Sequence, residues 1–211
     1  MSEPQQRVQV MQLFATPVAV TELPEAASLN SELKAVILKR EQEMPSTDHS
    51  NLGGWQSDWE MDRWAGPAFA RLMERAKAIA TQLTADREGR PVSIDWSYNA
   101  WANINRSGHG NESHTHPGAY WSGVYYVDDG GVGSDPSLGG EFEAHDPRGV
   151  APAMYAPKLA FAMPQGQSAG ASESVRPKSG MMVLFPSWLS HAVRPYHGQA
   201  TRISIAFNLS L

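Results

Sequence analysis

The chain has 211 residues, 41% of them hydrophobic, with seven tryptophans and no cysteine. The length can bury one substantial core, and the lack of cysteine excludes disulfide frameworks, thiolate catalysis and cysteine-ligated metal sites. With 22 acidic against 17 basic residues and no basic block, an electrostatic footprint for nucleic acid is missing.

We expect a single domain over residues 1–211, since nothing in the organisation of the chain demands a second one. The N-terminus lacks both the basic and the apolar region of a signal peptide. No run approaches the ~18 apolar residues that span a bilayer. A cytoplasmic protein with no membrane partner is the default expectation.

The first part of the chain, residues 1–91, is predicted to contain short strands and two supporting helices. Alternating apolar residues over 7–21, interrupted at a proline, favour two short strands. Apolar residues at helical spacing predict amphipathic helices over 28–43 and 67–86. The segment 50–57 is expected to be a loop or short strand.

Three tryptophans, Trp55, Trp59 and Trp64, lie close to that segment in the sequence. Tryptophan is mostly buried on average, so they are expected to fill the core. A substrate-facing role stays open for one of them.

From residue 92 the apolar period changes from helical to two, which predicts a mainly β region over 92–211. The expected strands are residues 93–105, 121–127, 140–145, 181–185 and 201–209. Two connectors rich in glycine, serine and proline, 128–139 and 164–174, look like mobile loops. The predicted class is therefore mainly β with flanking N-terminal helices (α+β), arranged as a jelly roll.

A candidate metal site starts from His114 and His116, which lie one residue apart. On a strand, two such side chains point to the same face, and His191 from a distant strand could close a third side of a metal ion. The remaining histidines are interpreted as ordinary surface or core residues; they are His49, His109, His145 and His197.

The segments around these histidines follow a recognisable order. The strand 121–127 with its tyrosines comes first, followed by Gly139-Gly140, a Pro-Lys-Ser-Gly turn before the apolar strand 181–185, His191 and then Arg202. This order resembles the Fe(II)/2-oxoglutarate-dependent dioxygenases, particularly the prolyl hydroxylase branch, over roughly residues 98–209. The implied fold is a double-stranded β-helix.

Further segments extend the resemblance into the first half of the chain. Leu-Phe-Ala-Thr-Pro at 13–17, Gly-Gly-Trp-Gln-Ser at 53–57, Phe-Pro-Ser-Trp-Leu-Ser-His at 185–191 and Arg-Ile-Ser-Ile-Ala-Phe-Asn at 202–208 are similar to a family of uncharacterised bacterial 2-oxoglutarate/iron oxygenases. The resemblance implies the oxygenase scaffold and names no substrate.

The resemblance implies a role for each matching residue. His114 and His191 fall on the first and the distal metal ligands, and Arg202 on the residue that pairs with the far carboxylate of 2-oxoglutarate. A guanidinium suits that task because its planar fork binds a carboxylate through two charge-assisted hydrogen bonds. Ser204, two residues on, shares the face of Arg202 and could bind the same carboxylate. Tyr126 falls where some prolyl hydroxylases place a phenol against the cosubstrate.

One position departs from the family pattern. His116 occupies the place of the usual Asp or Glu ligand, so the metal would be held by three neutral imidazoles. Losing the anion raises the net charge of the centre, which should strengthen its attraction for dianionic 2-oxoglutarate and alter its redox potential. Four carboxylates could in principle replace the missing one, although none lies at the expected offset; they are Asp128, Asp129, Glu141 and Glu143.

The implied function is hydroxylation of an amino acid, peptide or small metabolite, with Fe(II) as the metal, 2-oxoglutarate as cosubstrate, O2 consumed, and succinate and CO2 released. A cupin-type three-histidine dioxygenase or isomerase without 2-oxoglutarate is the second interpretation. Gly108 stands six residues before His114, as in the first cupin motif, but that motif's glutamate is missing and Arg202 would have no task. A non-enzymatic jelly-roll module that binds a ligand is the third. A homodimer remains an open alternative.

Overall fold

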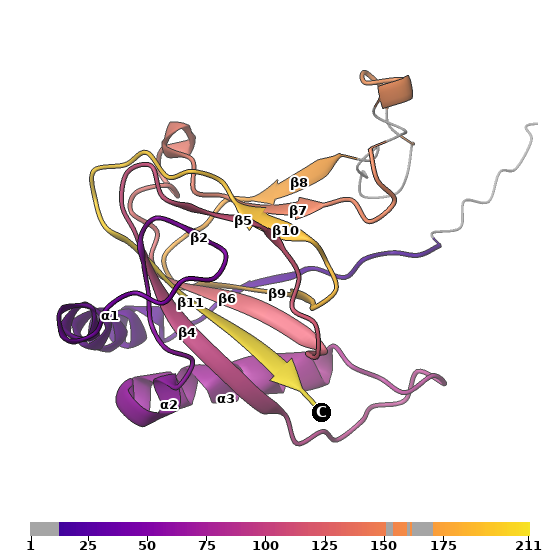
Figure 1. Ribbon diagram of the computed structural model, residues 1–211. Helices are drawn as coiled ribbons and strands as arrows, with labels where there is room; N and C mark the ends of the chain where they lie inside the picture. The colour runs from indigo at the N-terminus through magenta and orange to yellow at the C-terminus, as the bar shows by residue number, and fades with distance from the viewer. Residues whose placement is uncertain (1–12, 151–153, 160, 162–170) are drawn as a thin grey trace, which may run out of the picture.

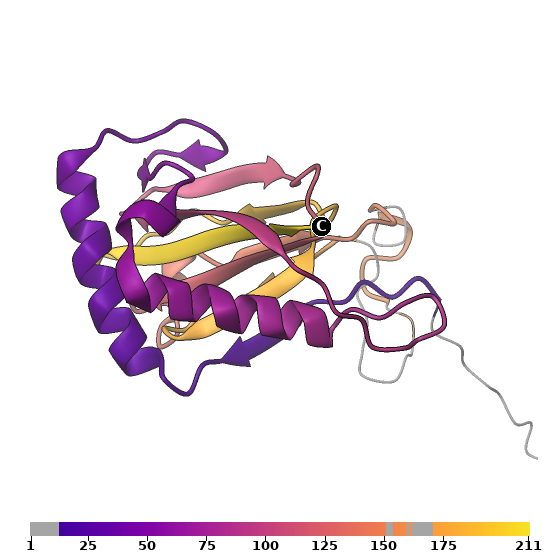
Figure 2. The same cartoon turned by 90° about the horizontal axis from the view of Figure 1, so that it is seen from below.

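The computed structural model describes residues 13–150, 154–159, 161 and 171–211. Two antiparallel β-sheets lie face to face, and helices cover the outer face of the larger sheet (Figures 1 and 2). This is the predicted mainly β fold, a double-stranded β-helix with N-terminal helices. Residues 7–12 of the predicted strand region 7–21 and most of the predicted loop over 164–174 lie outside the described residues.

The larger sheet has six strands in the order β1-β9-β6-β11-β4-β3. Their bounds are β1 Ala19–Glu22, β9 Met181–Pro186, β6 Trp121–Asp128, β11 Arg202–Ser210, β4 Ser97–Asn105 and β3 Trp55–Gln56. The smaller sheet has five strands in the order β2-β5-β10-β7-β8. Their bounds are β2 Asn51–Leu52, β5 Gly110–His114, β10 His191–Val193, β7 Phe142–His145 and β8 Ser172–Val175.

Strand β4 begins later than predicted, at Ser97 rather than at residue 93. Trp96 instead packs into the core, and its indole Nε1–H donates to the hydroxyl of Thr81 at 2.9 Å. The other four predicted strands are present with ends that differ by one or two residues. No bounds were predicted for β5, β8 and β10, because three to five residues are too few to show a period; strands at His114 and His191 were expected only from the metal-site argument.

Two long helices form the outer layer, α1 (Ala26–Glu43) and α3 (Gly66–Gln82), and the four-residue helix α2 (Met61–Trp64) precedes α3. Helix α3 ends four residues before the predicted limit. The cause is a turn in which the carboxylate of Asp86 accepts hydrogen bonds from the backbone N–H groups of Glu88 and Arg90, which reverses the chain.

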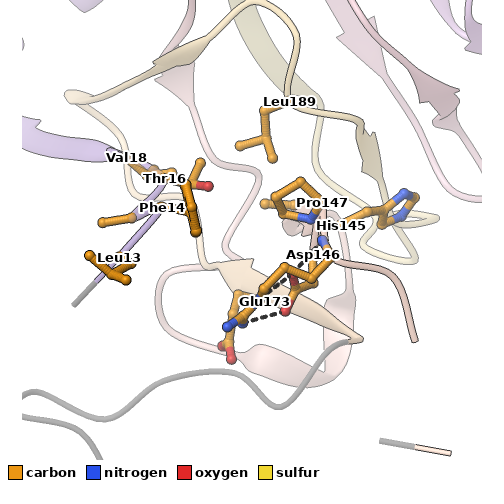
Figure 3. A pocket seen from close by; sticks show the side chains of 12 residues that line it. Leu13, Phe14, Thr16, Val18, His145, Asp146, Pro147, Glu173 and Leu189 are labelled. Carbon is orange, nitrogen blue, oxygen red and sulfur yellow. Dashed lines mark hydrogen bonds and ion pairs between the residues drawn. The ribbon is translucent and has the colours of Figure 1, made fainter. Parts of the chain in front are cut away.

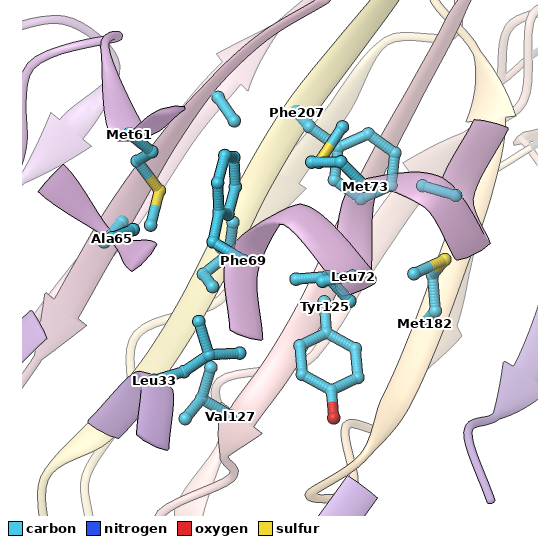
Figure 4. Close-up of a cluster of buried hydrophobic side chains, with 14 of the residues drawn as sticks. Leu33, Met61, Ala65, Phe69, Leu72, Met73, Tyr125, Val127, Met182 and Phe207 are labelled. Atoms are coloured by element: carbon cyan, nitrogen blue, oxygen red, sulfur yellow. The ribbon is translucent and has the colours of Figure 1, made fainter. Parts of the chain in front are cut away.

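The main core lies between these helices and the six-stranded sheet (Figure 4). Phe69 and Leu72 of α3 meet Tyr125 of β6 and Phe207 of β11 there. Successive side chains on a strand point to opposite faces. The strand residues that alternate with these core residues therefore face the second sheet. That inner face therefore carries the even-numbered residues of β6 and β11, among them Tyr126, and the odd-numbered ones of β4.

Candidate metal centre and cosubstrate pocket

His114 ends β5 and His191 begins β10, and the two residues are direct partners in the antiparallel pairing of these strands. Their ring centroids are 4.3 Å apart. The two histidines are far apart in the sequence but adjacent in the sheet, because directly opposed residues on one face bring their side chains into contact.

The prediction that His116 shares a strand with His114 is wrong, because β5 ends at His114. His116 lies in a turn, where its backbone N–H donates to the carbonyl oxygen of Ser187 at 2.9 Å and its own carbonyl accepts from Ala119 at 3.3 Å. This turn brings the His116 ring to 4.9 Å from that of His114 and 5.1 Å from that of His191, between centroids. The three rings converge as predicted, through a turn rather than through strand alternation.

The three histidines offer a set of ring nitrogens suited to a metal ion. One nitrogen from each residue lies within 4.8 Å of the others. The Nδ1 atoms of His114 and His191 contact the carbonyl oxygens of Glu112 at 2.7 Å and Leu189 at 2.9 Å. A carbonyl oxygen can only accept, so each Nδ1 carries the proton and each Nε2 keeps a free lone pair.

Burial keeps these imidazoles neutral. It lowers the pKa of His191 to about 3, helped by the neighbouring His114, and the pKa of His116 to about 4, again with a contribution from His114. Burial also lowers the pKa of His114, opposed by the hydrogen bond to Glu112. Neutral imidazole is the form that binds a metal, so the site is ready at physiological pH.

No carboxylate of the described chain joins this group of metal-binding atoms. Three of the four carboxylates considered from the sequence have other partners. Asp128 pairs with Lys34 at 2.6 Å, Glu143 pairs with Arg194 at 2.8 Å, and Asp129 accepts from the backbone N–H groups of Gly131 and Ser179. The described site is a cluster of three imidazoles.

Arg202, Ser204 and Tyr126 meet in the cavity that also contains the three histidines. Ser204 is the register partner of Tyr126 on one side and of Asn103 on the other. All four residues face the second sheet, as alternation along β4, β6 and β11 requires.

Arg202 is the unusual member of this cavity because only 1% of it is exposed and no described carboxylate pairs with it. Its Nη atoms donate to the side-chain oxygen of Asn105 at 3.0 Å and to the carbonyl oxygen of Gly140 at 3.1 Å, while Nε has no partner. Burial lowers the pKa of Arg202, yet a guanidinium stays charged. Its hydrogen-bond partners are neutral, and the carboxylates of Asp129 and Glu141 act on it only through longer-range electrostatic attraction. A buried cation without a directly paired anion is costly, so the pocket suits an anionic ligand.

Three further polar side chains of the cavity have no hydrogen-bond partner in the described structure. The hydroxyl of Tyr126 is buried without a hydrogen bond, and burial raises its pKa, so it is a protonated donor. Neither the hydroxyl of Ser204 nor the side-chain amide of Asn103 has a described partner, although both are largely buried. Sequence reasoning missed Asn103; its position opposite Ser204 was the signal that could have found it.

The remaining histidines lie outside the cluster of ring nitrogens. His109 accepts a hydrogen bond from the backbone N–H of Arg106, and His145 contacts the hydroxyls of Ser113 and Ser190. His49 lies against the indole of Trp59. These contacts agree with the ordinary roles that were expected.

The three tryptophans separate in the structure. Trp55 is buried in the core and Trp64 is half-buried against it, as predicted, whereas 47% of Trp59 is exposed. Trp59 lines a cleft of about 500 Å³ together with Trp101, His114 and His116. This cleft and the Arg202 cavity share four lining residues, so they meet at the histidines.

Another cavity, of about 210 Å³, contains none of the three histidines. Leu13 and Phe14 lie on one side of it, and Asp146 and Pro147, in a turn after β7, lie on the other (Figure 3). An aspartate followed by a proline is typical of a turn, and Asp146 and Pro147 lie in one.

The family described as "Putative 2OG-Fe(II) oxygenase" matches residues 99–208, slightly more than half of the chain and the segment that carries all three histidines and Arg202. The chain belongs to this oxygenase family. It is therefore an oxidoreductase, and Fe(II) and 2-oxoglutarate are the cofactors typical of its family. Membership of this family favours the first of the three interpretations over the cupin-type enzyme and the non-enzymatic module.

Solved structures show the same fold at low sequence identity. A prolyl-4-hydroxylase from Pseudomonas putida is 16% identical, with a TM-score of 0.63, and the match covers 92% of this chain and 91% of that chain. A Trichoplax adhaerens prolyl hydroxylase in complex with a hypoxia-inducible-factor peptide is 14% identical, with a TM-score of 0.63, covering 92% and 83%. HygX from Streptomyces hygroscopicus, with nickel and 2-oxoglutarate bound, is 13% identical, with a TM-score of 0.57 and the same coverage.

No curated protein sequence gives a significant match. Among the described helices, none has the length and apolar character needed to cross a membrane.

Proposed function

We propose that His114, His116 and His191 bind Fe(II), and that Arg202 binds the far carboxylate of 2-oxoglutarate. On this basis the protein hydroxylates an organic substrate, using O2 and releasing succinate and CO2. The observation that carries the proposal is the buried guanidinium of Arg202, which hydrogen-bonds to no carboxylate of the described residues and lines the same cavity as the three imidazoles.

The chemistry of the donor set fits the cofactors. Three neutral imidazoles on one side of a metal leave positions open on the other, as an oxygenase requires. When bound, the iron and 2-oxoglutarate would supply the oxidising chemistry, and the protein would supply binding and orientation. HygX, which shares the fold, holds nickel and 2-oxoglutarate.

The chain's own residues would bind and orient the cosubstrate. The unpartnered Nε of Arg202 and the hydroxyls of Tyr126 and Ser204 are donors that line one cavity. Charge-assisted hydrogen bonds from such donors are strong, and a carboxylate would satisfy groups that are otherwise left without partners. The Nδ1–H bonds to Glu112 and Leu189 hold two imidazoles in the orientation for metal binding.

The test compares Arg202→Met with the wild-type protein. Methionine keeps an unbranched apolar chain in the buried site and removes the charge. We expect 2-oxoglutarate affinity, measured by calorimetry on the Ni(II)-loaded protein, to fall at least a hundredfold while metal content stays near normal. Unchanged affinity would remove Arg202 from the cosubstrate site. A variant that also loses metal would indicate a collapsed pocket, and Arg202→Lys, which restores a cation, would then have to recover part of the affinity.

A further inference from the structure

The cleft beside the histidines has a continuous aromatic wall. Ring centroids are 4.9 Å apart between His49 and Trp59, 5.9 Å between Trp59 and Trp101, and 5.7 Å between Trp101 and His116. The wall thus runs from the half-exposed Trp59 to one of the proposed metal ligands. A substrate that lies along it would reach the metal from the cleft, while the cosubstrate occupies the Arg202 cavity.

Gln56 adds a side-chain amide to this cleft. It is only 2% exposed, lines the cleft, and its side-chain amide has no hydrogen-bond partner among the described residues. Strand β3 positions the side chain of Gln56. Gln56 pairs in register with Asn103. Trp55, the preceding residue on the strand, points the other way into the core. The buried side-chain atoms without partners in the described chain belong to Arg40, Tyr126 and Arg202, so the amide of Gln56 is accessible from the cleft and available to a ligand.

Asn99 provides a second donor through a directed chain of hydrogen bonds. The buried hydroxyl of Ser122 donates to Oδ1 of Asn208 at 2.8 Å, and Nδ2 of Asn208 donates to Oδ1 of Asn99 at 3.0 Å. The hydroxyl proton of Ser122 has no other acceptor described, which fixes the orientation of both amides. The free Nδ2 of Asn99 is then a donor on a residue that lines the cleft.

The charge of the cleft limits what it can hold. None of its described lining residues is lysine or arginine, and Glu112 is its one carboxylate. A free amino acid carries a carboxylate, which would need a cation here, whereas a residue within a peptide does not. The volume of about 500 Å³ lies in the range of ordinary ligand sites, about 300–1,000 Å³.

We propose that this cleft is the substrate site and that it takes a peptidyl residue with an uncharged or cationic side chain. The inference rests on the proposed function and names the substrate class for that site. Gln56 offers one donor and one acceptor, the pair that complements a peptide group, and Asn99 offers a further donor. Trp59 and Trp101 pack against the side chain of the substrate, and their faces attract a cation as well as an apolar group.

The test uses pools of N-acetylated, C-amidated tripeptides in which the central residue is fixed and the outer two are mixed. The Fe(II)-loaded protein is incubated with 2-oxoglutarate, O2 and each pool, and succinate and hydroxylated peptide are measured. We expect pools with uncharged or basic central residues to raise succinate formation at least fivefold over the peptide-free rate. Pools with Asp or Glu at the centre, and free amino acids, should leave it unchanged.

Two variants and two controls locate the site. Gln56→Leu and Trp59→Ala should each lower the stimulation at least tenfold while 2-oxoglutarate affinity stays within twofold. Gln82→Leu and Trp188→Ala make the same kinds of change at exposed positions outside the cleft and should leave the stimulation intact.

Each other outcome has a definite meaning. Intact 2-oxoglutarate binding with no active pool overturns the peptide class and leaves the proposed function standing. Active pools with unaffected Gln56→Leu and Trp59→Ala variants overturn the site. Failure of the wild-type protein to bind 2-oxoglutarate overturns the proposed function itself.

Discussion

The guanidinium of Arg202 lies over the ring of Tyr126, with its central carbon 5.2 Å from the ring centroid. The ring face offsets part of the cost of burying the cation, because the aromatic quadrupole attracts positive charge. The same arrangement leaves the Tyr126 hydroxyl and the Arg202 Nε buried without hydrogen-bond partners. The contact therefore reduces the cost of burying Arg202 and leaves two hydrogen-bond donors available to a ligand.

Tyr126→Phe separates these two contributions. It keeps the ring that faces Arg202 and removes the unpartnered hydroxyl, so the free energy of unfolding without ligand should be unchanged or slightly higher. Loss of one hydrogen bond should weaken 2-oxoglutarate binding about fivefold, since about 1 kcal/mol corresponds to that factor. Calorimetry and urea unfolding of the Ni(II)-loaded and metal-free proteins measure the two effects. A variant that binds 2-oxoglutarate as tightly as the wild type would place the phenol outside the cosubstrate site.

His191→Ala should abolish iron binding without unfolding the protein. His191 packs between Phe142 and Phe185, at ring-centroid distances of 5.2 and 4.5 Å, so its removal leaves a small cavity and a destabilisation of about 1–3 kcal/mol. Iron content by elemental analysis and folding by circular dichroism check both expectations. His197→Ala, at an exposed position outside the cluster, is the control and should retain full iron. Full retention in His191→Ala would exclude His191 as a ligand.

His116→Asp tests whether the third imidazole affects the affinity for the cosubstrate. Aspartate is a competent ligand, so metal should be retained, but it adds a negative charge close to the bound dianion. We expect 2-oxoglutarate affinity to fall about tenfold, which corresponds to about 1.4 kcal/mol and is reasonable for charges several ångströms apart in a partly buried site. Titration of 2-oxoglutarate into the two Ni(II)-loaded proteins makes the comparison. Tighter binding by the aspartate variant would contradict the electrostatic argument.

The parts of the site that could be predicted are those whose side chains have distinctive chemistry. The spacing of His114 and His116, the distant His191 and the Arg-x-Ser pattern at Arg202 are rare combinations, and alternation along β11 places Arg202 and Ser204 on one face. Long strands and helices could likewise be predicted, because their apolar periods extend over many residues.

The parts that could not be predicted depend on short elements and on amides. Strand β3 has two residues, so nothing in the local pattern indicates that Gln56 pairs with Asn103. The sequence does not show whether a side-chain amide in a strand has hydrogen-bond partners. The structure shows that the side-chain amide of Gln56 has none among the described residues. The turn at His116 was missed for a related reason, since its shape depends on a hydrogen bond to Ser187, remote in sequence.

The last prediction concerns Glu143, which joins three strands of the smaller sheet. Its carboxylate on β7 accepts hydrogen bonds from Arg194, which follows β10, and from Ser172 on β8. These bonds, with Arg194 first, lower the pKa of Glu143 from 4.5 to about 2. Because the folded pKa is depressed, the stabilisation is complete above about pH 4.5 and is lost as the pH falls toward 2.

Glu143→Gln should therefore lower the free energy of unfolding by about 1 kcal/mol at pH 7, a modest value because Arg194 is half exposed. The difference between wild type and variant should be less than half as large at pH 3. Urea unfolding at the two pH values measures it. Glu60→Gln, which breaks an exposed pair with Arg63, is the matched control and should change stability by less than about 0.5 kcal/mol at either pH. An equal loss at pH 7 and pH 3 would show that the ionised carboxylate is not what links the three strands.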